Sequence, residues 1–283
     1  MKKRGIALAC RHVTETQRVV TEDGVRLAVT SHGNAAHQAI LLIPGLGAAA
    51  SVFEPLVPSL QRRYRVITYD PRGIGASDRG DSELSLPLMA GDGIAVLNGF
   101  ALTRPHVLGA SMGGAIAQQL AVDHPDRVDH LLLAATAPAG RKAIPPDPRA
   151  MDALLGKGAR TPGDAYRLAC TVLYSPHFQR THPDFIAAQI AQRALHPVKP
   201  RVFSAQQAAL ARAGDLGDRL ADIVAPTLVM HGTADVVSPI ENAQMLATRI
   251  PHARTRWFEG CGHLFFHERP EETGRVVHEF VRG

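Results

Sequence analysis

Short apolar runs alternate with longer segments of helical periodicity along most of this chain. The run Ala39–Ile43 contains no polar residue and ends at Pro44-Gly45, which is typical of a strand buried on both faces of a sheet. Residues 65–69 and 106–108 have a similar character. Because strands and helices that alternate with short connections form parallel β-α-β units, the sequence predicts an α/β fold.

The expected elements follow from these patterns and from the turns that bound them. Asp23-Gly24 separates two apolar segments and is a hairpin signal. The expected strands are residues 18–20, 25–30, 39–43, 65–69, 106–108, 128–133, 227–230 and 254–258. The expected helices are residues 51–61, 86–100, 112–123, 239–248 and 270–281.

The alternation stops at Thr136 and resumes at Pro226. Residues 138–220 hold nine of the chain's 20 prolines, and the helical pieces in this interval are short and bounded by proline. We therefore expect a core domain built from residues 1–137 and 221–283, with residues 138–220 inserted as a helical cap.

The strongest functional signal is Gly109-Ala-Ser111-Met-Gly113, a G-x-S-x-G pattern between the strand 106–108 and the helix 112–123. A serine on a sharp strand-to-helix turn has a strained backbone, and flanking glycines keep other side chains away from it. Its hydroxyl then lies at the carboxyl edge of the sheet, beside the free N–H groups of a helix N-terminus. This context predicts that Ser111 is a nucleophile, with a glycine-rich turn and an idle serine as the alternative.

A serine at neutral pH needs a base, and the base needs an acid that orients it. Among 14 histidines, His263 follows the strand 254–258 in a glycine-rich loop that can reach back toward Ser111. His267 is the rival, although a surface or helix-flanking position accounts for it as well. A metal site of His263 and His267 has no third ligand at a suitable spacing, so we expect no metal.

Asp235 is the candidate acid. It follows the strand 227–230 in His231-Gly-Thr-Ala-Asp235, and loops after strands carry ligands and catalysis in open α/β sheets. The order Ser, Asp, His suits this chemistry. The other place for such an acid, after the strand 128–133, holds Ala134-Ala-Thr-Ala-Pro-Ala139 and therefore no carboxylate. We expect His231, at the end of its strand, to be structural.

The same chemistry needs hydrogen-bond donors for an oxyanion, each worth about 3–4 kcal/mol. The N–H of Met112, directly after the nucleophile, is the first expected donor. The second is expected in the loop Pro44-Gly45-Leu46-Gly47, where glycines let the backbone turn an N–H inward. We select Leu46 for this role and expect Gly45 to contact substrate; a plain tight turn is the alternative.

Together, these motifs resemble the α/β-hydrolase fold superfamily. They are, in the family's order, Pro44-Gly-Leu-Gly47, Asp70-Pro-Arg-Gly73-Ile-Gly75-Ala-Ser77-Asp78, Ser111-Met-Gly-Gly114, His231-Gly-Thr-Ala-Asp235 and Gly260-Cys-Gly-His263. The resemblance covers about residues 19–137 and 222–282 and is strongest to the esterases, lactonases and C–C-bond hydrolases, whose cap follows the sixth strand. It implies a mostly parallel, eight-stranded sheet with helices on both faces. It also implies Ser111 as nucleophile, His263 as base and Asp235 as acid, and gives Asp70 and Asp78 no catalytic role.

We therefore expect cofactor-free hydrolysis of a carboxylic ester or lactone of a small apolar molecule through an acyl-enzyme. No nicotinamide or phosphate-loop pattern is present, and Ser111 argues against the dehalogenases of this fold, which use aspartate as the nucleophile. Hydrolysis of a C–C bond, or peracid formation, in the same site is an alternative. A non-catalytic receptor for a small molecule is another, although such proteins often lose members of the triad.

The cap is expected to shape the substrate preference. Tyr174 and Phe178 are selected as substrate contacts from a set of apolar cap residues that could line a pocket over the nucleophile. The other members of the set are Leu154, Leu155, Tyr166, Leu168, Leu173, Phe185, Ile186 and Phe203.

Residues 138–220 carry twelve Lys and Arg against six Asp, whereas the rest of the chain has nineteen basic and twenty acidic residues. A basic cap favours anionic or electron-rich substrates, with solvated arginines on its outer face as the alternative.

Charge, apolar run length and cysteine content argue against a nucleic-acid-binding, exported, membrane-spanning or disulfide-rich protein. No basic helix is interleaved with aromatic residues, so we expect no nucleic-acid partner despite a net charge of +5. The apolar run of residues 5–10 is short for a signal peptide, and no run is long enough to span a membrane. Three separated cysteines do not indicate a disulfide framework. We expect a cytoplasmic protein, and a homodimer formed through the cap is compatible with the sequence.

Overall fold

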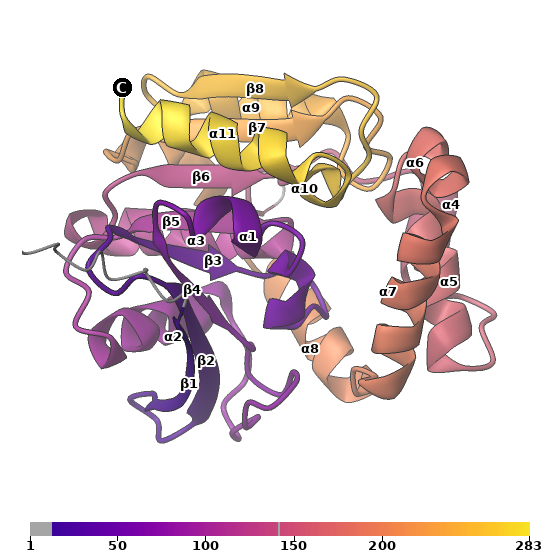
Figure 1. The fold of residues 1–283 in the computed structure, drawn as a ribbon, viewed down its shortest axis with the longest axis horizontal. Helices are drawn as coiled ribbons and strands as arrows, with labels where there is room; N and C mark the ends of the chain where they lie inside the picture. Colours follow the sequence, from indigo (N-terminus) through magenta and orange to yellow (C-terminus); the bar gives the residue numbers. More distant parts are fainter. Residues whose placement is uncertain (1–12, 141, 215) are drawn as a thin grey trace, which may run out of the picture.

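The computed structural model describes residues 13–140, 142–214 and 216–283 (Figure 1). Its strands are β1 Val13–Val20, β2 Arg26–Gly33, β3 Ala39–Ile43, β4 Arg65–Tyr69, β5 His106–Ala110, β6 Leu131–Ala134, β7 Thr227–Gly232 and β8 Arg254–Phe258. Its helices are α1 Val57–Leu60, α2 Leu86–Gly99, α3 Met112–Asp123, α4 Pro148–Leu154, α5 Pro162–Leu173, α6 Pro176–Thr181, α7 Pro183–Leu195, α8 Pro200–Ala211, α9 Ile240–Arg249, α10 Phe265–Glu268 and α11 Pro270–Val281. None of the helices in these ranges is both long enough and apolar enough to cross a membrane. The run considered as a signal peptide, residues 5–10, lies outside the described residues.

The strands form one eight-stranded sheet in the order β1-β2-β4-β3-β5-β6-β7-β8. β2 pairs antiparallel with both β1 and β4. From β4 to β8 along this order, every neighbouring pair is parallel. The prediction of a mostly parallel, eight-stranded sheet is therefore confirmed.

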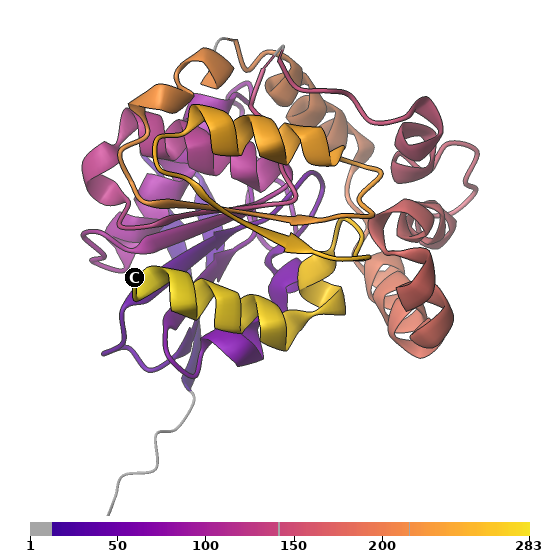
Figure 2. The same ribbon diagram turned by 90° about the horizontal axis from the view of Figure 1, so that it is seen from above.

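Helices cover both faces of the sheet, as Figure 2 shows. In β3, Leu41 and Ile43 belong to the core that also contains buried residues of α2, α3 and α9. Ile40 and Leu42 point to the opposite face and share a core with residues of α1 and α11. All five residues of β3 are buried, which explains why its sequence has no polar residue.

Helices α4 to α8 follow β6 and precede β7 in the sequence, and they lie beyond the carboxyl ends of the parallel strands (Figure 1). Each of these five helices has proline in its first turn. A proline at that position costs no hydrogen bond within the helix, because the first N–H groups have no helical partner. The proline-rich composition of this region therefore marks helix starts. The division of the chain into domains at 137/138 and 220/221 stays a prediction.

The segment 51–61, which the sequence predicts as one helix, is interrupted. A 3-10 turn covers Ala50–Phe53, and α1 begins only at Val57. The cause is Pro55, which lacks the N–H that a continuous helix would need at this position. The segment between β3 and α1 lies at the carboxyl edge of the sheet, and most of its residues from 45 to 52 line the candidate site.

Candidate active site

Ser111 stands on the turn between β5 and α3. Its backbone angles, φ 55° and ψ −122°, are rarely adopted by residues with a side chain. The Ser111 N–H donates to the Ala134 carbonyl at 2.9 Å. The Ser111 carbonyl accepts from Thr136 Oγ1 at 2.7 Å and from the Gly114 N–H at 2.8 Å. β6 and the residues after it therefore hold this strained turn in place.

The glycines of the motif are required by close packing. A Cβ atom at Gly113 would lie 2.1 Å from the Ile43 carbonyl oxygen, and one at Gly109 would lie 2.2 Å from the Gly113 carbonyl oxygen. A Cβ atom at Gly45 would lie 3.1 Å from the Ser111 Cβ. Glycine at these positions brings β3, β5 and α3 together and leaves room around the serine hydroxyl.

His263 and Asp235 are paired. Nδ1 of His263 lies 2.7 Å from Oδ2 of Asp235, and both side chains are buried. The other carboxylate oxygen, Oδ1, accepts the N–H groups of Val237 and Ser238 at 2.8 and 2.9 Å. Burial by itself would raise the pKa of Asp235, but the electrostatic interaction with His263 and the hydrogen bonds from His231 and His263 hold it well below its usual range. Asp235 is therefore an ionised carboxylate whose position is fixed.

His231 is a second partner of this carboxylate, which sequence reasoning missed. Its Nε2 lies 3.2 Å from Oδ2 of Asp235 and 2.8 Å from the Ser238 carbonyl oxygen. Because that carbonyl only accepts, Nε2 carries the proton and is oriented toward both oxygens. The spacing of four residues between His231 and Asp235 at the end of β7 is the signal that could have indicated this contact.

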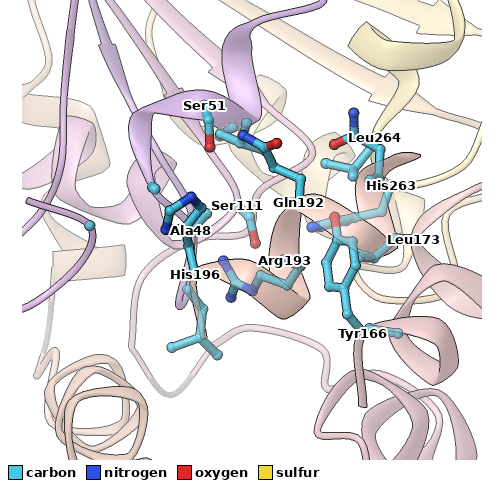
Figure 3. A pocket seen from close by; sticks show the side chains of 18 of the residues that line it. Ala48, Ser51, Ser111, Tyr166, Leu173, Gln192, Arg193, His196, His263 and Leu264 are labelled. Carbon is cyan, nitrogen blue, oxygen red and sulfur yellow. The ribbon is translucent and has the colours of Figure 1, made fainter. Parts of the chain in front are cut away.

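Ser111 and His263 line one cavity of about 500 Å³ at the carboxyl edge of the sheet. Figure 3 shows the imidazole of His263 extending toward the Ser111 hydroxyl. Gly45 and Leu46 border the same cavity. The structure thus brings together Ser111, His263 and, behind the imidazole, Asp235.

The cap helices contribute two faces to this cavity. Tyr166, Ala169 and Leu173 of α5 line it at the helical spacing i, i+3 and i+7. Gln189, Gln192, Arg193 and His196 line it at i, i+3, i+4 and i+7 from α7 and the residue that ends it. Leu154 and Phe203 complete the contribution of the predicted apolar set. One wall of the cavity is therefore apolar and the other is polar.

The structure does not place Tyr174 or Phe178 in the lining of the cavity. Tyr174 is 2% exposed, and its hydroxyl is 2.9 Å from Nδ1 of His267. Phe178 stacks on Tyr174 and on His182, so it packs within the cap. The α5 face that reaches the cavity ends at Leu173, and the next residue turns about 100° away from that face. The structure thus places Tyr166 and Leu173 in the lining of the cavity, where the sequence led us to expect Tyr174 and Phe178.

His267 is buried rather than on the surface. Its Nε2 lies 2.6 Å from the Val52 carbonyl oxygen, which makes that nitrogen the protonated one, and its Nδ1 accepts the Tyr174 hydroxyl. Burial lowers its pKa to about 4. Both nitrogens are occupied, so His267 links the loop after β3 to the cap and is no rival base.

Met112 directly follows Ser111 in the chain, and Leu46 lines the cavity that contains Ser111. Met112 is the first residue of α3, so its N–H has no partner within the helix. Among the described residues, the N–H of Leu46 donates to no protein acceptor. The assignment of these two N–H groups to an oxyanion site stays a prediction.

One cluster in the described ranges has the spacing of a metal site, and it lies elsewhere. Asp129 Oδ2 is 3.2 Å from Nδ1 of His106 and 3.0 Å from Nδ1 of His130. His106 begins β5, whereas Ser111 follows the other end of that strand. The cluster therefore takes no part in the cavity.

The family model described as the alpha/beta hydrolase fold matches residues 38–270. The chain belongs to the α/β-hydrolase family. The match spans the serine turn, the cap helices and the loops of Asp235 and His263, and the chain is accordingly a hydrolase of this fold. The predicted resemblance is confirmed.

Related proteins match over most of this chain and most of their own length. A protein of Caulobacter vibrioides named "Putative carbamate hydrolase RutD" is 30% identical over 269 residues, which is 93% of this chain and 97% of that protein. A poly(3-hydroxyalkanoate) depolymerase of Ectopseudomonas oleovorans is 31% identical and covers 86% of this chain and 84% of its own length. A hydrolase of Pseudomonas aeruginosa superposes with a TM-score of 0.81 at 26% identity, over 95% of this chain and 98% of that one.

Arg193 and its polar neighbours on α7 line the cavity of this α/β hydrolase, and the sequence analysis did not single them out. Arg193 donates to the Gly47 carbonyl, and its guanidinium lies 5.5 Å from the centre of the Tyr166 ring. Burial lowers the pKa of Arg193 and raises that of Tyr166 to about 12. Polar residues at positions 189, 192, 193 and 196 lie on one face of a helix, and this spacing could have indicated the polar side of the cavity.

Proposed function

We propose that this chain is a serine hydrolase that cleaves a carboxylic ester or lactone of a small apolar molecule through an acyl-enzyme. The observation that carries the proposal is the convergence of Ser111 and His263 on one cavity, with Asp235 bonded to the far nitrogen of the imidazole. These are the nucleophile, base and orienting acid that acyl transfer requires.

The tautomer of His263 determines which of its nitrogens can act as the base in acylation. Because Asp235 accepts at Nδ1, that nitrogen carries the proton and Nε2 is left with a lone pair. Nε2 takes the proton of Ser111 as the Oγ atom bonds to the substrate carbonyl carbon. The imidazolium formed is stabilised by the ionised Asp235, and it then protonates the departing alkoxide.

The oxyanion of the tetrahedral intermediate is proposed to accept from the N–H groups of Leu46 and Met112. Gly45 supports this arrangement because the absence of a side chain leaves space beside Ser111. Donors fixed in the backbone need no reorganisation as charge develops, and each is worth about 3–4 kcal/mol. A water molecule then attacks the acyl-enzyme with His263 again as base.

The apolar wall of α5 supports an acyl or alcohol part with little polarity, since Tyr166, Ala169 and Leu173 offer it no charge. The names of the relatives support hydrolysis at a carbonyl carbon, because one is named for carbamates and another for a polyester. C–C-bond hydrolysis and peracid formation use the same residues, as does a receptor, and the experiment below separates a receptor from a hydrolase.

Turnover of p-nitrophenyl butyrate by Ser111→Ala and Ser51→Ala variants tests the proposal. Ser51 lines the same cavity, so its replacement controls for a change of the lining. We expect Ser111→Ala to lose at least about 10⁴-fold in kcat and Ser51→Ala to stay within about tenfold of wild type. Rapid labelling of Ser111 by a fluorophosphonate without turnover of any ester would instead favour a receptor.

A further inference from the structure

A second cavity, of about 510 Å³, adjoins the one that contains Ser111. It lies between the loop 73–79 after β4 and the segment 195–202 that joins α7 to α8. Ala49, Gly75, Arg193 and His196 line both cavities. The two cavities therefore share part of their boundary, and the second lies within the reach of a long substrate bound at Ser111.

The second cavity is strongly basic. Arg79, Arg193, Lys199 and Arg201 line it, and none of these four has a carboxylate within ion-pair distance among the described residues. Asp78 is the acidic residue of the lining, and Nε of Arg26 holds its carboxylate at 2.7 Å. Cations that line one cavity without an internal counter-ion attract an external anion.

We propose that this second cavity is a subsite for a phosphate group carried by the substrate at a distance from the scissile carbonyl. The inference rests on the proposed function and names its substrate class: an ester with one apolar part and one phosphorylated part. A phosphate monoester carries close to two negative charges and three acceptor oxygens at neutral pH. It can therefore bind several cations at once, whereas a carboxylate offers one charge and two oxygens.

The hydrogen bonds already present leave donors for such a group. Arg79 uses one nitrogen for the carbonyl groups of Gly80 and Ser82, and Arg193 uses one for the carbonyl of Gly47. A guanidinium has five N–H donors, so both side chains keep donors free. Lys199 and Arg201 are exposed at the rim, where a solvated anion would meet them first.

A matched pair of substrates tests the subsite. The first is the butyrate monoester of 1,6-hexanediol, and the second is the same ester with a phosphate monoester on its free hydroxyl. We expect kcat/KM for the phosphorylated ester to exceed that for the neutral one by about tenfold at low ionic strength and to fall toward it in 0.5 M salt, because salt screens exposed charges. In a Lys199→Gln/Arg201→Gln double variant, the preference should disappear while turnover of the neutral ester is unchanged.

Arg180→Gln/Arg167→Gln is the matched control, since both arginines are on the cap and neither lines this cavity. If this control variant loses the preference for the phosphorylated ester as fully as Lys199→Gln/Arg201→Gln does, the preference comes from the overall charge of the cap. That result would overturn the proposal of a local phosphate site. Equal kcat/KM for the two esters in wild type would also overturn it, while leaving ester hydrolysis intact.

Binding to the Ser111→Ala variant gives a test that does not need turnover. Calorimetry should detect 6-hydroxyhexyl phosphate binding at least about tenfold more tightly than 1,6-hexanediol, with the difference abolished by Lys199→Gln/Arg201→Gln. Equal binding of the two compounds contradicts the subsite, whichever bond the enzyme cleaves.

Discussion

Nδ1 of His263 lies 2.7 Å from Oδ2 of Asp235, although the two residues come from different loops and are 28 positions apart in the sequence. This contact fixes the imidazole so that its other nitrogen is the one available in the cavity. The chemical role proposed for Ser111 depends on it, because a serine hydroxyl is a weak nucleophile until a base accepts its proton.

Replacing Asp235 with asparagine should lower kcat by about 10³–10⁴-fold, since the amide presents the wrong partner to Nδ1 and favours the other tautomer of His263. KM should change little, because Asp235 does not line the cavity. Steady-state kinetics on an ester, with circular dichroism to verify folding, measures this. A kcat within tenfold of wild type would contradict the assigned role.

The same variant should reveal a pH-dependent contribution to stability. The pKa of Asp235 is depressed in the folded protein and is about 3.9 in an unfolded chain. Its ionised form therefore stabilises the fold fully above about pH 5, and this contribution is lost as the pH falls below the unfolded value. The difference in unfolding free energy between wild type and Asp235→Asn, measured in urea, should shrink between pH 6 and pH 3; a constant difference would argue against it.

His231 should behave as a positioning residue. Its Nε2 is directed at the carboxylate oxygen that also receives His263, so His231→Phe removes one donor and leaves that oxygen less restrained. We expect kcat to fall about tenfold with KM unchanged, and His231→Gln, which restores an N–H donor, to recover part of the loss. If both variants lose activity equally and in step with their loss of folded protein, the role of His231 is structural.

Glycine replacements in two helices should have opposite effects. Gly113→Ala places a methyl group 2.1 Å from a backbone oxygen of β3, and we expect a loss of at least about 3 kcal/mol in unfolding free energy or no folded protein. Gly91→Ala in α2 meets no atom within 4 Å and should stabilise by about 0.5–1 kcal/mol. Thermal unfolding of the two variants checks this, and similar melting temperatures would contradict the packing described at the serine turn.

The sequence predicted the features that short segments encode. Buried parallel strands have apolar runs, and the turn at Ser111 needs glycines at fixed neighbouring positions, so both leave local signals. The break at Pro55 also had a local signal, although helical spacing on either side of it concealed the interruption.

Features that depend on how helices pack were not predicted. Tyr174 directly follows Leu173, yet Leu173 faces the cavity and Tyr174 faces His267, and composition does not distinguish two such neighbours. The contact between His231 and Asp235 likewise depends on the path of the loop after β7. The sequence placed an excess of positive charge on residues 138–220, and the structure locates three of these cations, Arg193, Lys199 and Arg201, at the cavity that adjoins the one containing Ser111.

Trapping the acyl-enzyme tests the central claim most directly. Wild type and the Ser111→Ala and Ser51→Ala variants should be treated with a fluorophosphonate and, separately, with a slowly hydrolysed p-nitrophenyl ester, and the modified peptides identified by mass spectrometry. We predict a single adduct on Ser111 in wild type and in Ser51→Ala, formed together with ester turnover, and none in Ser111→Ala. An adduct on another residue, or turnover retained by Ser111→Ala, would contradict the account.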